Sequence, residues 1–172
     1  MPSMKSVISG HNRKLLRENR EDMMYDDECV CNEDECLLSG NCQKREVVYR
    51  AVVKSENVEK EYIGQTKRTF KERHKEHADS FKSKSLFKRS KLSRHIWSLK
   101  EKNKDYQINW SVMSKARKYT RESKFCKLCN TEKTFIARQD PAVGLNARSE
   151  LLTRCPHRDG HLLTNWVGKR RP

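Results

Sequence analysis

The sequence predicts a small α+β domain in which three short strands form a sheet and helices pack on it. Two patterns lead to this prediction. Segments rich in β-branched residues alternate with segments whose apolar residues recur at helical spacing, in the order β–β–α–α–β–α. In addition, four of the seven cysteines precede the first strand, in an acidic loop. We therefore expect a cysteine-rich N-terminal loop beside a small sheet.

The first two strands are predicted from a β-branched run and a shorter run that follows it. Val47–Val53 is rich in valine and too short for a buried helix. The polar stretch 54–60 that follows contains Ser55-Glu56-Asn57, which is a turn signal. Glu61–Gly64 then forms the second strand, which ends at its glycine. We expect the two strands to pair in antiparallel fashion.

A helix is predicted to begin after Thr69, because Glu72 three residues later completes a capping box. Arg73 and His77 are four residues apart, so their side chains lie on one face of this helix. The stripe expected to face inward consists of Phe70, His74, His77, Ala78 and Phe81.

Three further elements are predicted in the second half of the chain. They follow a lysine- and serine-rich connector over 83–91, which we expect to be a mobile loop. Helical spacing indicates a helix over 90–100, and alternation indicates a strand over 106–113. A last helix is predicted over 130–138, and Asp140-Pro141 ends it. The residues that these patterns turn inward are Leu92, His95, Ile96, Leu99, Ile108, Trp110, Val112, Glu132, Phe135 and Ile136.

Positive charge dominates the composition. The 172 residues include 38 Lys and Arg against 23 Asp and Glu, which gives a net charge of +15, while hydrophobic residues make up 34%. Such an excess favours a polyanionic partner, because phosphates that pair with Lys and Arg release counterions. Basic RNA-associated proteins without catalysis share this composition, so charge predicts nucleic acid but no chemistry.

The organisation of the chain is predicted from changes in composition. No apolar run approaches the roughly 20 residues of a membrane span, and the N-terminus lacks the apolar region of a secretion signal. We expect a nuclear protein, or otherwise a cytoplasmic one, and not a secreted one. The predicted parts are a flexible N-terminal arm (1–27), a cysteine-rich zinc-binding segment (28–45), a folded domain (46–154) and a basic C-terminal tail (155–172).

Seven cysteines in a reducing compartment indicate thiolate ligands of a metal rather than disulfides. The preferred ligand set for a structural zinc is Cys36, Cys42, Cys126 and Cys129. It would join the start of the first strand to the start of the last helix. A second set replaces the first two ligands with Cys155 and His157. The remaining alternative is a scatter of free cysteines, some of them buried as small hydrophobic residues.

Several residues follow one another in the order of a known nuclease motif. They are Tyr49, Tyr62-Ile63-Gly64, Arg73, His77, Glu132 and Asn146. This constellation resembles the GIY-YIG endonuclease domain. It is closest to the endonuclease of Penelope-like retroelements, which also has cysteine pairs before the first motif and before the glutamate helix. The first motif departs from the family, because Val47-Val48-Tyr49 lacks its glycine. The resemblance implies a three-stranded antiparallel sheet flanked by helices.

The resemblance also implies an enzyme that nicks DNA by metal-dependent hydrolysis of a phosphodiester bond. Glu132 would bind one Mg²⁺ or Mn²⁺ ion, and Arg73 would contact phosphate oxygens. Tyr49 would act as a general base or proton relay, while Tyr62 would hold the water or the phosphate. His77 would orient a tyrosine or contact phosphate.

Contacts with DNA are expected from residues around this site, where they would position phosphates without reading sequence. These residues are Lys67, Arg68, Lys71 and Asn146. In a complete retroelement, an upstream reverse transcriptase would be a further partner, and the nick would expose a 3′ end for priming. Two alternatives stay open: a catalytically inactive, zinc-stabilised module that binds nucleic acid, and a structural zinc protein of the RNA machinery.

Overall fold

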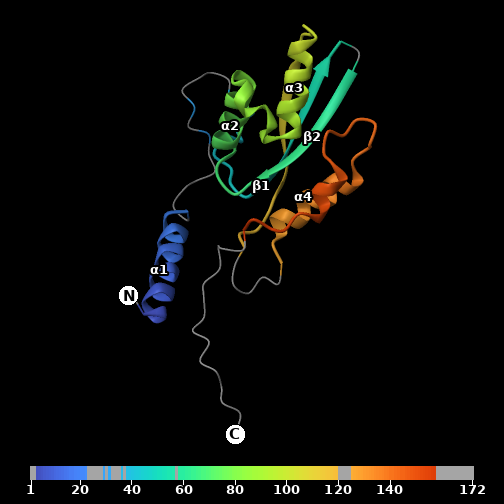
Figure 1. The fold of residues 1–172 in the computed structure, drawn as a ribbon. Helices are drawn as coiled ribbons and strands as arrows, with labels where there is room; N and C mark the ends of the chain where they lie inside the picture. Colours follow the sequence, from blue (N-terminus) through green and yellow to red (C-terminus); the bar gives the residue numbers. More distant parts are fainter. Residues whose placement is uncertain are drawn as a thin grey trace.

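The computed structural model describes residues 3–22, 29, 31, 36, 38–56, 58–119 and 125–157. Within these ranges the chain has the predicted α+β fold, built on a three-stranded antiparallel sheet (Figure 1). The central strand is β1 (Val47–Ser55), between β2 (Val58–Thr66) and β3 (Gln107–Lys115). The first two strands are longer than predicted, because their polar ends also pair, as far as Ser55 and Val58.

Helices make up most of the remaining described chain. They are α1 (Met4–Asp22), α2 (Phe70–Lys82), α3 (Lys91–Glu101), α4 (Lys127–Arg138) and the short 3₁₀-helices η1 (Lys84–Arg89) and η2 (Arg148–Leu152). None of the described helices combines the length and the apolarity that crossing a membrane requires. The basic residues 168–172 of the predicted tail lie outside the described residues.

Two segments differ from the sequence-based expectations. α1 occupies most of the segment 1–27, which was predicted as an N-terminal arm without a regular element. The predicted mobile loop over 83–91 contains η1 and the first residue of α3. Leu86 and Phe87 of η1 are half-buried, and the Leu86 amide donates to the Ser83 carbonyl at 3.0 Å. The segment is therefore a 3₁₀-helix that contacts α2 and α3 rather than an irregular loop.

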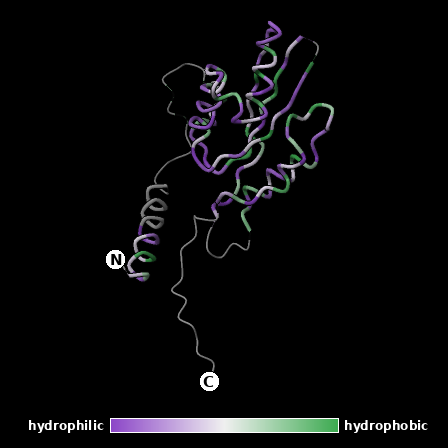
Figure 2. The backbone as a smooth tube through the Cα atoms, viewed as in Figure 1, coloured by the Kyte–Doolittle hydropathy of each residue, from purple (hydrophilic) through white to green (hydrophobic). Residues whose placement is uncertain are grey.

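The sheet carries helices on both faces (Figure 1). Alternate residues of β1, including Val47 and Tyr49, are buried in a core that also contains residues of α2 and α3. Val48 points to the other face and shares a second core with Ile63 of β2 and with residues of α4. Figure 2 shows hydrophilic and hydrophobic residues interspersed along these helices, as expected for helices with one buried side. Residues of α2 and α4 can therefore meet only at an edge of the sheet.

The N-terminus of α2 is fixed by the segment that precedes β1. Thr69 caps the helix through the predicted capping box. The amides of Phe70 and Lys71 donate to the carbonyl oxygens of Lys44 and Cys42, at 2.9 and 2.8 Å. These carbonyls satisfy donors that have no acceptor within the helix itself. The cysteine-rich segment therefore sets where α2 begins and which side chains it presents.

Small polar side chains join α2 to α3. Ser80 and Ser93 are both buried, and their hydroxyl oxygens lie 2.5 Å apart. Of the predicted inward stripe of α2, Phe70 and His77 are buried, while the other members are half-buried. The apolar pattern missed the two serines because it counts only hydrophobic residues.

The outer edge of β2 is closed by residues that follow α4. The amide of Glu61 donates to the Val143 carbonyl at 3.0 Å, and the Leu145 amide donates to the Glu61 carbonyl at 2.8 Å. Two residues further along β2, at Ile63, the side chain of Asn146 makes these hydrogen bonds in place of backbone groups. Its Oδ1 accepts from the Ile63 amide and its Nδ2 donates to the Ile63 carbonyl, both at 2.8 Å. This pairing brings η2 to the β2 edge.

Gly64 leaves the space that the Tyr49 ring occupies. The two residues are cross-strand partners, and a Cβ atom on Gly64 would lie 2.5 Å from the Tyr49 hydroxyl oxygen. Next to Tyr49, the pairing of β1 with β3 shifts register between Val48 and Tyr49. Such irregularities re-aim side chains beside functional sites. The ring of Tyr49 is therefore directed across Gly64 by features of both neighbouring strands.

This packing predicts that Gly64→Ala displaces the Tyr49 ring and destabilises the fold by roughly 1–3 kcal/mol, as overpacking of a core does. Thermal unfolding measures the effect. Gly10→Ala in α1 is the matched control, because a Cβ there meets nothing within 4 Å. Equal unfolding temperatures of the Gly64 variant and the wild type would contradict the close packing.

Candidate functional site

Tyr49, Arg73 and His77 form one hydrogen-bonded group. The Tyr49 hydroxyl lies 2.7 Å from His77 Nε2. Arg73 Nε donates to the Tyr49 oxygen at 3.0 Å. β1 supplies the tyrosine, and α2 supplies the arginine and the histidine one turn apart. Because Arg73 can only donate, the hydroxyl proton of Tyr49 is left to point at His77 Nε2.

The pKa values show where the protons of this group lie. Burial, followed by the nearby Arg73 charge, lowers the pKa of His77 to about 3, so its ring is neutral at pH 7. Burial raises the pKa of Tyr49 to about 12, against the opposing effect of Arg73. Tyr49 is therefore a neutral phenol that donates to a neutral imidazole. His77 is therefore hydrogen-bonded to the tyrosine, and its two predicted roles stay predictions.

Glu132 belongs to α4, on the opposite face of the sheet from α2, and its charge acts on this group. Its carboxylate raises the pKa of Tyr49 and of Tyr62, though less than their burial does. Burial, and then the charge of Glu150, raises the pKa of Glu132 to about 7, and Arg73 opposes that rise. Its carboxylate forms no hydrogen bond or ion pair with any residue that the structure describes. Such a half-buried, unpartnered carboxylate suits a hard divalent cation.

Tyr62 and Asn146 complete the predicted set at the β2 edge. Tyr62 is buried, and its ring packs edge-on against His77 with centroids 5.8 Å apart. Asn146 Nδ2 donates to Glu150 Oε2 at 2.9 Å as well as to the Ile63 carbonyl. Asn146 thus aligns η2 and positions Glu150. Its predicted contact with DNA stays a prediction.

The predicted basic contacts lie at the start of α2. Lys67, Arg68 and Lys71 are exposed. Arg68 pairs with Glu76, which also accepts from Arg73 Nη1 at 2.8 Å. Glu76 therefore orients the guanidinium of Arg73. Its spacing from Arg73 is the i, i+3 pattern of a helical ion pair, and this signal in the sequence could have identified it.

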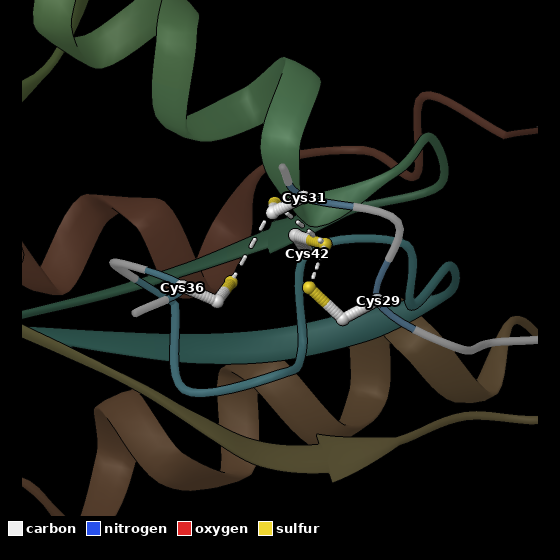
Figure 3. Close-up of side chains that lie close together, drawn as sticks. All are labelled: Cys29, Cys31, Cys36 and Cys42. Carbon is white, nitrogen blue, oxygen red and sulfur yellow. Dashed lines mark hydrogen bonds between the residues drawn. The ribbon is translucent and has the colours of Figure 1, made fainter. Parts of the chain in front are cut away.

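Four cysteine sulfur atoms converge beside the N-terminus of α2 (Figure 3). The group, called here the four-cysteine cluster, consists of Cys29, Cys31, Cys36 and Cys42, and its Sγ atoms lie within 4.8 Å of one another. Neighbouring Sγ atoms are separated by 3.3 to 3.9 Å. Tetrahedral zinc with Zn–S bonds of about 2.3 Å has sulfur atoms about 3.8 Å apart. The four-cysteine cluster could hold a metal ion such as zinc.

A second group, the cysteine–histidine cluster, lies at the N-terminus of α4. It consists of Cys126, Cys129, Cys155 and His157. His157 Nδ1 lies 3.3 Å from the Sγ atoms of both Cys126 and Cys129, and the Sγ atoms of Cys129 and Cys155 are 3.4 Å apart. These separations are again close to the edges of a zinc tetrahedron. Amide donors, Gln65 Nε2 and the His157 backbone N–H, also face the sulfur atoms. The cysteine–histidine cluster could likewise hold a metal ion.

The preferred zinc set from the sequence needs correction. The structure assigns Cys36 and Cys42 to the four-cysteine cluster, and Cys126 and Cys129 to the cysteine–histidine cluster. The first pair packs with the core on the α2 side and the second with the core on the α4 side, so the sheet separates them. The second proposed set, in which Cys155 and His157 join the C-x-x-C pair, is the one that the structure brings together.

Comparisons with protein-family models, with curated proteins and with solved structures find no match for this chain. The residues and their geometry therefore carry the functional argument.

Sequence reasoning missed three residues of this region besides Glu76. Cys29 and Cys31 were recognised as cysteines but were left out of the ligand set. Glu150 was not considered, although its side chain caps η2 by accepting from the Ala147 amide at 3.0 Å. A carboxylate three residues after a helix start is a capping signal, and it could have drawn attention to Glu150.

The two clusters predict about two tightly bound zinc ions per chain, measured by mass spectrometry of the native protein. Cys42→Ser and Cys129→Ser should each remove one ion and leave the other, because each variant breaks one cluster. A single ion per chain that either substitution abolishes would instead support one shared site.

The raised pKa of Glu132 predicts a pH-dependent effect on stability. Below about pH 4.5 the carboxyl is protonated whether the chain is folded or not, but near pH 8 the folded protein holds a buried charge. In metal-free buffer, Glu132→Gln should therefore stabilise the protein at pH 8 by up to about 3 kcal/mol and at pH 4.5 by much less. Denaturant unfolding at both pH values measures this. A gain of equal size at both would contradict the burial of the charge.

Proposed function

We propose that this protein is a metal-dependent DNA endonuclease of the GIY-YIG type that nicks one strand by phosphodiester hydrolysis. The observation that supports it best is the bonding of Tyr49 to both Arg73 and His77, within the electrostatic reach of Glu132. A phenol, a fixed cation and an unpartnered carboxylate can together supply the proton transfer, charge stabilisation and metal binding that phosphodiester hydrolysis uses.

Arg73 is the phosphate-binding residue in this proposal. Its Nε bonds to Tyr49 and its Nη1 to Glu76, whereas its Nη2 forms no hydrogen bond with a described residue. The guanidinium is therefore aimed by two neighbours and keeps a donor for a phosphate oxygen. Since arginine does not lose its charge, this donor is present at every working pH.

Tyr49 and His77 form the proton path. The Tyr49 oxygen uses one lone pair for Arg73; because Tyr49 is fully buried, its other lone pair would take a proton from the attacking water only when the packing opens to admit that water. As that proton arrives, the hydroxyl proton moves to His77 Nε2, so the phenol stays neutral, as its pKa of about 12 favours. Burial is the main cause of the low pKa of His77 and the Arg73 charge the second; a phosphate bound by Arg73 would offset only the second, which makes the imidazole a somewhat better acceptor.

Glu132 is the residue that would hold a Mg²⁺ or Mn²⁺ ion. Its lack of a partner among the described residues and its raised pKa fit this role, because a bound cation would stabilise the ionised carboxylate. One such ion would supply charge neutralisation for the scissile phosphate and its leaving oxygen. Tyr62, whose hydroxyl has no partner among the described residues, offers a donor to the same phosphate.

Zinc in the two clusters would hold the two halves of the site in place. Cys42 of the four-cysteine cluster accepts a hydrogen bond through its carbonyl oxygen from the first turn of α2. The same helix carries Arg73 and His77. The cysteine–histidine cluster joins the start of α4 to the segment that follows η2 in the sequence. Glu132 is a residue of α4. Loss of either ion should therefore disturb the alignment of the site.

The biological setting that we propose follows the resemblance noted above. The enzyme would derive from a retroelement, act on DNA in the nucleus, and expose a 3′ end for an associated reverse transcriptase. The excess of basic residues supports nucleic acid as the substrate.

A plasmid-nicking assay in Mg²⁺ tests the proposal. Arg73→Ala and Glu132→Gln should each lower the nicking rate by roughly 10²-fold or more, because each removes charge stabilisation of the transition state. Arg50→Ala is the matched control, since Arg50 is exposed, lies in the same strand as Tyr49 and pairs with Glu61.

Equal nicking by wild type and both site variants would refute the assignment. A second outcome is that the wild type binds DNA in a salt-sensitive way but fails to cut it with any divalent cation. In that case the protein is a catalytically inactive, zinc-stabilised binding module. Retained zinc and an unfolding temperature no lower than that of the wild type in each variant would exclude misfolding as the cause of lost activity.

A further inference from the structure

A basic pocket opens on the α3 side of Tyr62. It has a volume of about 240 Å³ and lies where β2, η1, α3 and η2 come together. The residues that line it are Tyr62, Lys88, Arg89, Ser90, Lys91, Arg94 and Glu150. None of the four basic residues in this lining belongs to the Tyr49 group described above.

The positive charge of the basic pocket is not compensated. Its four basic residues form no ion pair with any residue that the structure describes. By contrast, Lys84 in the same 3₁₀-helix pairs with Glu101 at 2.9 Å. The lining contains one acid, Glu150, and its two oxygens already accept hydrogen bonds from neighbours in its own segment. Unpaired cations gathered in a hollow favour a bound anion.

Two kinds of neutral donor also face the basic pocket. It lies at the N-terminus of α3, where Ser90 caps the helix and the first turn has no acidic residue. The first amides of a helix lack acceptors and carry partial positive charge. Tyr62 is only 7% exposed, and its hydroxyl bonds to no described residue. The hydroxyl is not among the buried side-chain atoms that lack a partner, so it is accessible from the pocket and can donate to a bound acceptor.

We propose that the basic pocket binds a backbone phosphate of DNA next to the phosphate that is cut, and thereby fixes the position of the strand at the site. This subsite presupposes the endonuclease function proposed above. Tyr62 connects the two places, because it lines the pocket while its ring packs against His77. Glu150 also lines the pocket, and its charge raises the pKa of Glu132, so the pocket adjoins the carboxylate of the proposed site as well.

Binding of duplex DNA by the zinc-loaded protein in buffer without Mg²⁺, Mn²⁺ or chelator, measured by fluorescence anisotropy over a series of salt concentrations, tests the subsite without cleavage. Lys88→Gln/Lys91→Gln should weaken binding and reduce the slope of log K against log salt by about 1, as expected when one phosphate contact is lost. The matched control is Lys102→Gln/Lys104→Gln, which removes the same charge near the other end of α3. It should leave the slope unchanged.

A second measurement locates the phosphate. In this measurement, DNA substrates carry a single neutral methylphosphonate at one position on either side of the nicking site, and nicking is followed in Mg²⁺. At one of these positions the methylphosphonate should slow nicking by the wild type. The same methylphosphonate should not slow the Lys88→Gln/Lys91→Gln variant any further. Equal slopes for both double variants, or additive effects at every position, would overturn the subsite. A loss confined to an RNA duplex would also overturn it and assign the pocket to RNA. DNA binding that depends on the pocket, in a protein that never cuts, would keep the phosphate site but refute the nuclease.

Discussion

The structure depends on the contact of the Tyr49 hydroxyl with two side chains of α2. That contact exists only because Gly64, its partner across the sheet, has no side chain in the way. Tyr49 is fully buried, so its hydroxyl must be hydrogen-bonded, and Arg73 and His77 meet this need. The same bonds align a phenol with a cation and a neutral imidazole. One packing constraint thus fixes both the local fold and the arrangement that we propose to be catalytic.

The two cysteine-containing clusters explain how so polar a chain holds this arrangement. Hydrophobic residues make up 34% of the sequence, and the sheet divides them between two small cores. Each cluster lies at the first turn of a helix that carries a proposed site residue: Cys42 next to α2, and Cys126 at the cap of α4. Metal ligation is a usual means of stabilising small domains whose cores are modest. The basic pocket lies at a third helix start, that of α3.

Local chemistry made much of the fold predictable. The valine-rich run of β1 and the Thr69 capping box of α2 are short-range signals, and the structure contains both elements. The grouping of cysteines was not predictable in the same way. C-x-x-C spacing identifies Cys126 and Cys129 as partners, but only the fold decides which distant residues join them, and the sheet excludes Cys36. Glu150 carries a capping signal at the start of η2, but the sequence does not show that β2 and Asn146 bring it close enough to Glu132 to raise the pKa of that carboxyl.

In the proposed site, a divalent cation bound by Glu132 would lie beside Tyr49 and Arg73. Mn²⁺ titrated into the zinc-loaded protein tests it by NMR, because the paramagnetic ion broadens only nearby resonances and prefers oxygen ligands. We predict early broadening of the Arg73 Nε–H and Tyr49 ring signals, and its loss in Glu132→Gln. Broadening confined to other parts of the protein, or broadening that persists unchanged in Glu132→Gln, would contradict the account.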